Sequence, residues 1–168
     1  MSKAFTKDES DPSVTEVVSA RAPLPSGTPN YVTPRGLALL QGELGELEAV
    51  RAALGADDAS ARRALGARFL ELEARIASAL VVDPATHPHD RVRFGARVRV
   101  SGADGGERAF QIVGVDEANP AEGRIAFTAP LARALLGTSL GDAVRFQSPR
   151  GVEELEVIEI RYAATDSG

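Results

Sequence analysis

The chain has 168 residues, of which 43% are hydrophobic and 26% charged, with no cysteine, two histidines and a net charge of −5. A chain of this length forms about one domain, or two small ones. The absence of cysteine excludes disulfides, thiolate zinc sites and cysteine nucleophiles, and two histidines leave little for a metal site or a Ser–His pair. The composition therefore argues against most enzyme classes, and the acidic charge argues against tight binding of bulk DNA.

The N-terminal segment shows no sign of a membrane or secretory element. No apolar run in the chain approaches the roughly 20 residues needed to cross a bilayer. Residues 1–11 lack the apolar centre of a secretory signal, so we expect a cytoplasmic protein without a membrane partner. Prolines and small polar or acidic residues over 1–30 predict a disordered tail.

Residues 31–82 carry the pattern of a helical hairpin. Thr33 followed by Pro34 is typical of a helix start, with Thr as the N-cap and Pro at the first helical position. Leucines at spacings of three and four predict a helix over 34–54 with a coiled-coil seam, which Arg51 interrupts.

A second apolar stripe predicts a second helix over 58–80, formed by Leu65, Phe69, Leu72, Ile76 and Leu80. Gly55 is expected as the C-cap of the first helix, and an aspartate at 57 or 58 as the N-cap of the second. A turn this short forces the two helices to run antiparallel. At 1.5 Å per residue the hairpin is about 30–35 Å long.

The hydrophobic period changes to two after a linker at 83–90. Apolar residues alternate with arginines from Arg91 to Val100, which predicts a strand with one solvated face. Its arginines are expected to pair with glutamates of the last strand (Glu153, Glu154 and Glu156), the alternative being a nucleic-acid contact. Residues 91–163 thus predict an α+β domain, an antiparallel sheet with one short helix, followed by a tail at 164–168. The further strands are expected near 110–113, 124–128, 144–147 and 152–162, and the helix at 130–136.

Several motifs occur in the order found in one known family. The N-terminal motif is Asn-Tyr-Val-Thr-Pro-Arg-Gly at 30–36, and the C-terminal ones occupy 94–98, 110–117, 129–137, 141–142, 149–151 and 157–162. Together they resemble the bacterial Gre transcript-cleavage factors, and GreB most closely, over about 30–163. The resemblance implies an FKBP-like C-terminal domain that holds the rim of the RNA polymerase secondary channel, and a hairpin that enters the channel.

In that family, acidic residues at the hairpin tip help to position a second Mg²⁺ at the polymerase active site and so promote hydrolysis of backtracked RNA. The resemblance implies no catalytic residue, metal or cofactor in the factor itself. Its implied partners are bacterial RNA polymerase and, within that complex, nascent RNA. We expect a monomer.

This chain departs from the family pattern at the tip. No acidic stretch lies between Leu54 and Leu65, and the hairpin is about twenty residues short, a loss of roughly 15 Å of reach at 1.5 Å per residue. Since a carboxylate must come within about 2.1 Å of Mg²⁺ to ligate it, we expect weak or absent cleavage stimulation. The chain resembles in this respect the regulator of nucleoside diphosphate kinase, a relative with a short hairpin. Asp57 and Asp58 are either helix caps or a shortened acidic tip.

The resemblance also suggests contact residues. Thr128 and Ala129 stand where the family commonly has Asp or Asn and then Ser, so the polymerase contact is expected to be weaker or altered. The polymerase-binding candidates are Asp116, Glu117, Thr128, Pro130, Leu131 and Arg133, whose alternative roles are a solvated loop and core packing. Arg62 and Arg63, with Arg68 nearby, either contact RNA or form a solvated face.

Two other classes of function remain open on the sequence. The FKBP-like domain could be a peptide-binding or prolyl isomerase module, although such a pocket needs aromatic residues, which make up only 5% of this chain. The short hairpin could instead bind or regulate a protein other than polymerase.

Overall fold

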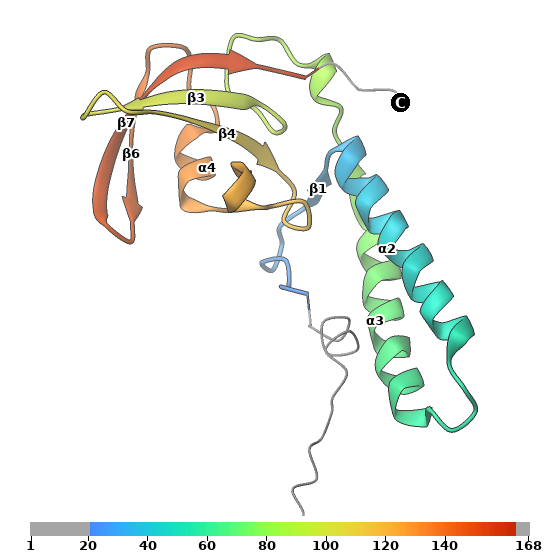
Figure 1. The fold of residues 1–168 in the computed structure, drawn as a ribbon. Helices are drawn as coiled ribbons and strands as arrows, with labels where there is room; N and C mark the ends of the chain where they lie inside the picture. The colour runs from blue at the N-terminus through green and yellow to red at the C-terminus, as the bar shows by residue number, and fades with distance from the viewer. Residues whose placement is uncertain (1–20, 164–168) are drawn as a thin grey trace, which may run out of the picture.

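The computed structural model describes residues 21–163, so the predictions on 1–20 and 164–168 lie outside the described residues. A helical hairpin projects from one side of a sheet domain (Figure 1). This arrangement confirms the predicted α+β class. Within 21–163 no helix is long and apolar enough to cross a membrane.

The hairpin consists of α2 (Pro34–Ala53) and α3 (Ala59–Ala77). Thr33 caps α2 as predicted, its hydroxyl oxygen accepting a hydrogen bond from the N–H of Gly36 at 2.9 Å. The predicted apolar stripes meet between the two helices, where the buried leucines are Leu40, Leu47, Leu65 and Leu72. The helical hairpin therefore closes by the leucine packing that its periodicity predicts.

A small parallel sheet at the base of the hairpin was not predicted. It joins β1 (Asn30–Val32) to β2 (Ala79–Val81), with Asn30 opposite Ala79. The second helix was expected to continue to residue 80 but ends at Ala77. The sheet ties the start of the hairpin to its end, and the side chain of Asn30 strengthens the tie by donating to the carbonyl oxygen of Arg75 at 2.8 Å.

The segments predicted as tail and linker also make contacts. Within the described part of the predicted tail, 21–30, Asn30 belongs to β1 and Arg21 forms ion pairs, so this part is not disordered. In the predicted linker, a short 3-10 helix η1 (Pro84–Thr86) buries Pro84. The rings of His87 and His89 lie 5.6 and 5.3 Å from that of Tyr162. Both segments therefore pack against the domains.

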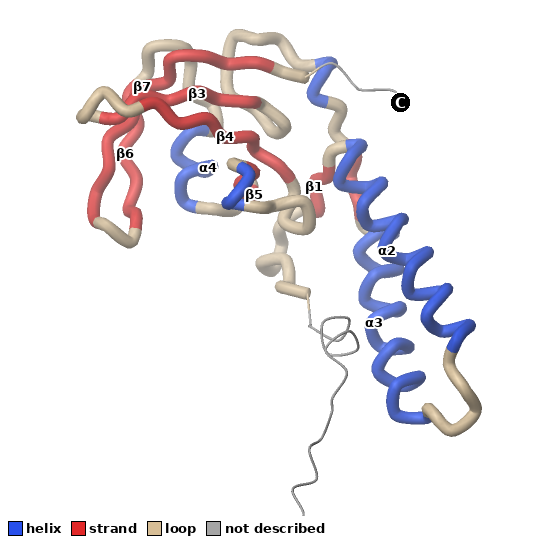
Figure 2. The backbone as a smooth tube through the Cα atoms, viewed as in Figure 1, coloured by secondary structure: helices blue, strands red, loops and turns tan. Residues whose placement is uncertain are grey.

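The larger sheet has five strands in the order β5-β4-β3-β7-β6, drawn in red in Figure 2. The strands are β3 (Arg97–Gly102), β4 (Glu107–Val113), β5 (Arg124–Ala126), β6 (Ala143–Ser148) and β7 (Gly151–Arg161). The prediction of a wholly antiparallel sheet is wrong, because β5 runs parallel to β4 after a loop that contains the 3-10 helix η2 (Pro120–Glu122). The first strand also begins six residues later than predicted, because Gly95 turns the chain at φ +86° with Pro84 packed against it.

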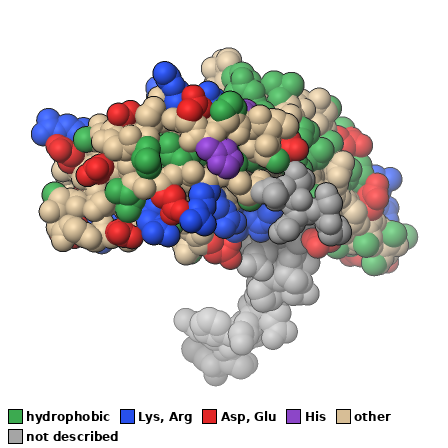
Figure 3. All heavy atoms as spheres, turned by 90° about the horizontal axis from the view of Figure 1, so that it is seen from above, with side chains coloured by type: hydrophobic (Ala, Val, Ile, Leu, Met, Phe, Trp, Pro, Cys, Tyr) green, Lys and Arg blue, Asp and Glu red, His purple; other side chains and the backbone are tan. Residues whose placement is uncertain are grey.

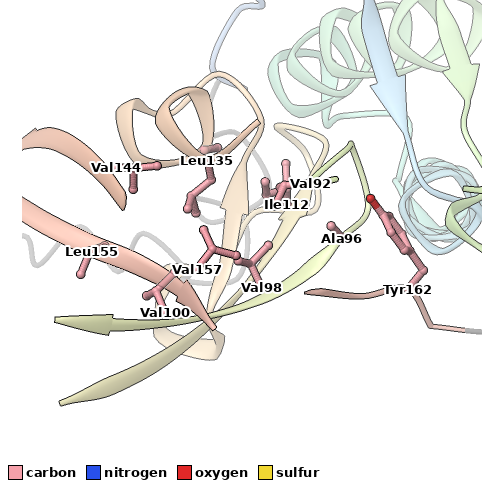
Figure 4. Packing of buried hydrophobic residues seen from close by; sticks show 11 residues of the cluster. Val92, Ala96, Val98, Val100, Ile112, Leu135, Val144, Leu155, Val157 and Tyr162 are labelled. Atoms are coloured by element: carbon pink, nitrogen blue, oxygen red, sulfur yellow. The ribbon is translucent and has the colours of Figure 1, made fainter. Parts of the chain in front are cut away.

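The core of the sheet domain lies between the sheet and α4 (Pro130–Leu135). Figure 4 shows the side chains of Val98, Val157 and Ile112 from the strands facing Leu135 from the helix. These four side chains are at most 1% exposed. The predicted short helix thus has a structural role as the cover of the core.

The opposite face of the sheet carries charges of both signs. The predicted interstrand pairing occurs, but with other partners: on this face Arg99 pairs with Glu159 at 3.1 Å and Glu154 pairs with Arg145 of β6. Glu153 pairs with Arg108 of β4 on the other face, since these two residues lie opposite Phe146 and Val100 of the core side. A register shift between Arg99 and Val100 sets which residues of β3 and β7 lie opposite each other. Figure 3 shows acidic and basic side chains interleaved on the surface seen from above.

Candidate functional site

The hairpin tip holds the two predicted acids, Asp57 and Asp58, in exposed positions. Asp58 is the N-cap residue of α3 by position, but its carboxylate accepts from the N–H of Gly55 at 3.0 Å rather than from the helix. Gly55 lies one residue beyond the observed C-cap, Leu54. Asp58 therefore stabilises the tip turn through this hydrogen bond. Asp57, the other acid of the tip, does not make that hydrogen bond.

The arginines near the tip divide into two kinds. Arg62 is exposed and donates to the carbonyl oxygen of Gly55 at 2.9 Å, so it also closes the turn. Arg63 is exposed beside it. Arg68 instead pairs across the hairpin with Glu43 at 2.6 Å, and within α3 with Glu71 at 3.1 Å. Of the three, Arg62 and Arg63 are placed where they could meet a phosphate.

The candidate docking segment, 128–133, lies on the sheet domain. Pro130 and Arg133 are exposed, while Thr128 is half-buried and Leu131 packs partly against the core. Ala129 occupies the N-cap position of α4, and no side chain there caps the helix. Pro130 and Arg133 are therefore the members of this segment best placed for a partner.

The other two docking candidates, Asp116 and Glu117, are buried inside the molecule. Glu117 is 4% exposed. Its carboxylate accepts a hydrogen bond from the hydroxyl of Thr33 and lies 3.3 Å from a guanidinium nitrogen of Arg35. The expectation that these two acids face a partner is thus not supported, because their carboxylates join the sheet domain to the base of the hairpin.

Asp116 belongs to a charge network that also includes the N-terminal segment. One of its oxygens accepts from Arg21 at 2.5 Å, and the other lies 3.4 Å from the guanidinium Nε of the buried Arg75. Arg21 reaches on to Glu43 of α2, and Arg75 donates to the carbonyl oxygen of Ala22 at 2.7 Å. No local sequence signal marks Arg21, because its partners lie 22 and 95 residues away.

The charges of this network shift the pKa of two of its members. Burial opposes ionisation of Glu43 and Arg21, but the facing groups dominate. The hydrogen bonds and charges of Arg21 and Arg68 hold the pKa of Glu43 below its usual 4.5. Those of Asp116 and Glu43 likewise raise the pKa of Arg21. Both side chains therefore remain charged near neutral pH.

Aromatic packing completes the junction between hairpin and sheet domain. The ring of Tyr31, from β1, lies 5.9 Å from that of Phe94 and 5.6 Å from that of Phe127, in tilted and edge-on geometry. Gly114 approaches so closely that a Cβ there would lie 2.6 Å from the carbonyl oxygen of Tyr31. The rings of Phe94 and Phe127 also lie 5.7 Å apart, so the three aromatic rings pack on one another and do not line an open pocket.

The described residues contain no group of three or more His, Cys, Asp or Glu side chains arranged to hold a metal ion. The two histidines, His87 and His89, pack on Tyr162. The hydroxyl of Tyr162 donates to the carbonyl oxygen of Arg91 at 2.5 Å and accepts from the N–H of Arg93 at 2.9 Å. This cluster is a structural one that fixes the start of the sheet domain.

Comparison with known proteins identifies the family. The family model described as transcription elongation factor, GreA/GreB, C-term, matches residues 87–162. The transcription elongation factor GreA of Helicobacter pylori (strain G27) is 36% identical over 135 residues, covering 80% of this chain and 79% of the relative. GreA of Psychrobacter sp. (strain PRwf-1) is 38% identical over 152 residues, covering 78% of this chain and 96% of the relative.

A solved structure of the prokaryotic transcription elongation factor GreA/GreB from Nitrosomonas europaea is 25% identical, with a TM-score of 0.42, and covers 79% of this chain and 98% of that one. The curated relatives named above carry the GreA name, whereas the motifs resembled GreB most closely. The identity and coverage of these relatives show that the chain belongs to the GreA/GreB family of transcription elongation factors.

Proposed function

We propose that this chain docks at the rim of the RNA polymerase secondary channel and regulates elongation there with little or no stimulation of transcript cleavage. Factors of the GreA/GreB family bind bacterial RNA polymerase. The chain pairs a projecting helical hairpin with a sheet domain whose motif at 129–137 resembles the family's docking segment. In this proposal the chain is not itself an enzyme and acts in the cytoplasm, where its polymerase works.

The short arms of the hairpin carry the proposal. The helices α2 and α3 have 20 and 19 residues, so each arm is about 30 Å long at 1.5 Å per residue. The alignment with the Psychrobacter factor spans 152 positions but uses only 78% of these 168 residues, so about twenty positions of that alignment have no residue here. The number of missing positions matches the shortfall predicted from the hairpin sequence.

The chemistry of the tip also argues against stimulation of transcript cleavage. Stimulation of hydrolysis through a second Mg²⁺ requires carboxylate oxygens at about 2.1 Å from the ion. Asp57 and Asp58 are the acids of the tip turn, and Asp58 is held by the N–H of Gly55. A tip that is short by several ångströms cannot place either carboxylate in that shell, so occupancy of the channel is the effect we propose.

A cleavage assay on a stalled, backtracked elongation complex tests this function. The wild-type chain should leave the cleavage rate close to that of polymerase alone, and the Asp57→Ala/Asp58→Ala variant should behave alike. The wild-type chain should also reduce the cleavage produced by an authentic cleavage-competent Gre factor, because both occupy one site. Strong stimulation that the double variant abolishes would contradict the proposal, and so would a failure to compete at micromolar concentration.

The packing of the aromatic residues disfavours the isomerase alternative. A site for a peptidyl-proline ring needs open apolar and aromatic surface, whereas Tyr31 occupies the space beside Phe94 and Phe127. We expect no acceleration of proline isomerisation in a model peptide, a measurement that needs no polymerase.

A further inference from the structure

Four side chains form a row across the charged face of the sheet. The strand register places Arg124 of β5 opposite Gln111 of β4. Gln111 in turn lies opposite Arg97 of β3, and Arg97 lies opposite Arg161 of β7. Directly opposite residues project from the same face, and neighbouring strands are about 4.8 Å apart, so this arginine row is roughly 15 Å long.

A cleft of about 650 Å³ separates the arginine row from the start of the hairpin. Arg97, Gln111 and Arg124 line it from the sheet, and Arg35 lines it from the first turn of α2. The cleft therefore brings three guanidinium groups and an amide from both domains around one space. Its volume is in the range of ordinary ligand sites.

Most of the charged side chains around the cleft already have an ion-pair or hydrogen-bond partner. Arg124 pairs with Glu122, Arg161 with Glu159, and Arg35 with Glu117. Two acids, Asp83 and Glu117, also line the cleft. Asp83 accepts a hydrogen bond from the N–H of Ala85, and Glu117 is held by Thr33 and Arg35.

Arg97, at the centre of the arginine row, forms no ion pair with any residue in 21–163. It is exposed and lies opposite another arginine, Arg161, in the sheet. Like charges directly opposite each other on neighbouring strands are destabilising. An anionic partner would offset that repulsion, so this position is where a bound carboxylate would contribute most.

We propose that the arginine row and Arg35 form a docking site for an acidic segment of RNA polymerase, whose Asp and Glu carboxylates lie against Arg97. This inference rests on the proposed function, since it names the chemistry of the same partner. Arginine presents a planar, two-pronged donor set that matches a carboxylate. The residues that line the cleft include no aromatic side chain on which a nucleic-acid base could stack. The net charge of −5 also disfavours RNA as the occupant.

Charge reversal at Arg97 tests the site. Because the chain has no cysteine, a dye on a single cysteine introduced at the exposed Gln147 reports binding to core RNA polymerase by fluorescence anisotropy. Arg97→Glu should weaken the affinity at least about tenfold, because it places a carboxylate against the partner's acids. Arg150→Glu makes the same charge change in the exposed turn between β6 and β7 and should stay within about twofold of wild type. Arg97→Gln should give an intermediate loss of affinity. A thermal unfolding midpoint of this variant close to that of wild type should show that the fold is kept.

Competition identifies the chemistry of the occupant. An oligoglutamate peptide should displace the wild-type chain from polymerase more effectively than it displaces the Arg97→Glu variant, and an oligouridine RNA should displace neither. Equal affinity of the Arg97→Glu and Arg150→Glu variants would overturn the docking site while leaving the proposed function intact. Competition by RNA that depends on Arg97 would also overturn it. A wild-type chain that does not bind polymerase would remove both proposals.

Discussion

Gly36→Ala is the substitution that most directly probes the junction between hairpin and sheet domain. Gly36 is buried in the first turn of α2. A Cβ at this position would lie 2.9 Å from a carboxylate oxygen of Glu117 and 3.4 Å from the hydroxyl oxygen of Thr33. Glu117 must therefore move, and because it is buried and bound to Thr33 and Arg35, its movement breaks contacts that join the two domains.

Two opposing free energies decide the outcome. Replacing glycine by alanine inside a helix ordinarily stabilises the folded state by about 0.8–1 kcal/mol. Loss of a hydrogen bond to a buried charged group costs about 1.5–3 kcal/mol. The contact of Glu117 with Arg35 adds little, because the Arg35 side chain is 55% exposed. We therefore expect Gly36→Ala to lower the free energy of unfolding by about 0.5–2 kcal/mol.

The helix itself offers matched controls. Gly42 and Gly45 lie in the same helix, both are exposed, and nothing lies within 4 Å of a Cβ built on either one. Gly42→Ala and Gly45→Ala should each stabilise the fold by about 0.5–1 kcal/mol. In a chain of this size 1 kcal/mol moves the thermal midpoint by about 2–4 °C. Far-UV circular dichroism during heating should thus show a lower midpoint for Gly36→Ala and higher midpoints for the controls.

The reasoning also predicts a coupling between two positions. In a Glu117→Ala background the added methyl group meets no carboxylate, so Gly36→Ala should become neutral or stabilising there. A Gly36→Ala variant whose midpoint rises as much as those of Gly42→Ala and Gly45→Ala would refute the tight junction. An equal destabilisation with and without the Glu117 carboxylate would refute its assigned cause.

Two further predictions concern the contacts around Tyr162 and Glu43. Tyr162→Phe removes a hydroxyl that bridges the backbone of Arg91 and Arg93. It should cost about 1–3 kcal/mol, measured by urea unfolding, and an unchanged midpoint would contradict the bridge. Because the pKa of Glu43 is lowered in the folded state, its charge stabilises the fold above pH 4.5, and this contribution is lost as the pH falls through the folded pKa. Glu43→Gln should therefore lower the thermal midpoint at pH 7 and have less effect at pH 3, whereas an equal effect at both would contradict the pairing with Arg21.

The parts of the fold that the sequence predicted well depend on local patterns. Apolar residues three and four residues apart predicted both hairpin helices, since an apolar stripe on a helix must be buried regardless of which segment it packs against. The cap at Thr33 was predictable because its partner, Gly36, lies three residues away. Alternation of apolar and charged residues gave the strands of the larger sheet, although not where β3 begins. The turn at Gly95 that delays β3 depends on Pro84, which packs against it from another segment.

The parts that the sequence did not predict depend on distant partners. β1 and β2 have three residues each, too few for a visible period, and their pairing joins Asn30 to Ala79. Asp116 and Glu117 look like a solvated acidic loop in the sequence. Their burial follows from Arg75 and Thr33, which lie far away in the chain. The junction was therefore missed. The position of the tip turn, whose residues are all local, was predicted to within one residue, although Leu54 rather than Gly55 is the C-cap and the Asp58 side chain does not cap α3.

The junction matters for function because it sets the direction in which the hairpin projects, and a small change of angle at the base moves the tip far. For an arm about 30 Å long, a change of about 10° at the base moves the tip by roughly 5 Å. That displacement exceeds the roughly 4 Å over which side chains are in contact. Variants such as Gly36→Ala, which loosen the contact of Glu117 with the hairpin base, should thus reduce competition with a cleavage-competent Gre factor although they touch no polymerase. Equal competition by Gly36→Ala and wild type would show that this short hairpin needs only to be present in the channel, and need not be aimed.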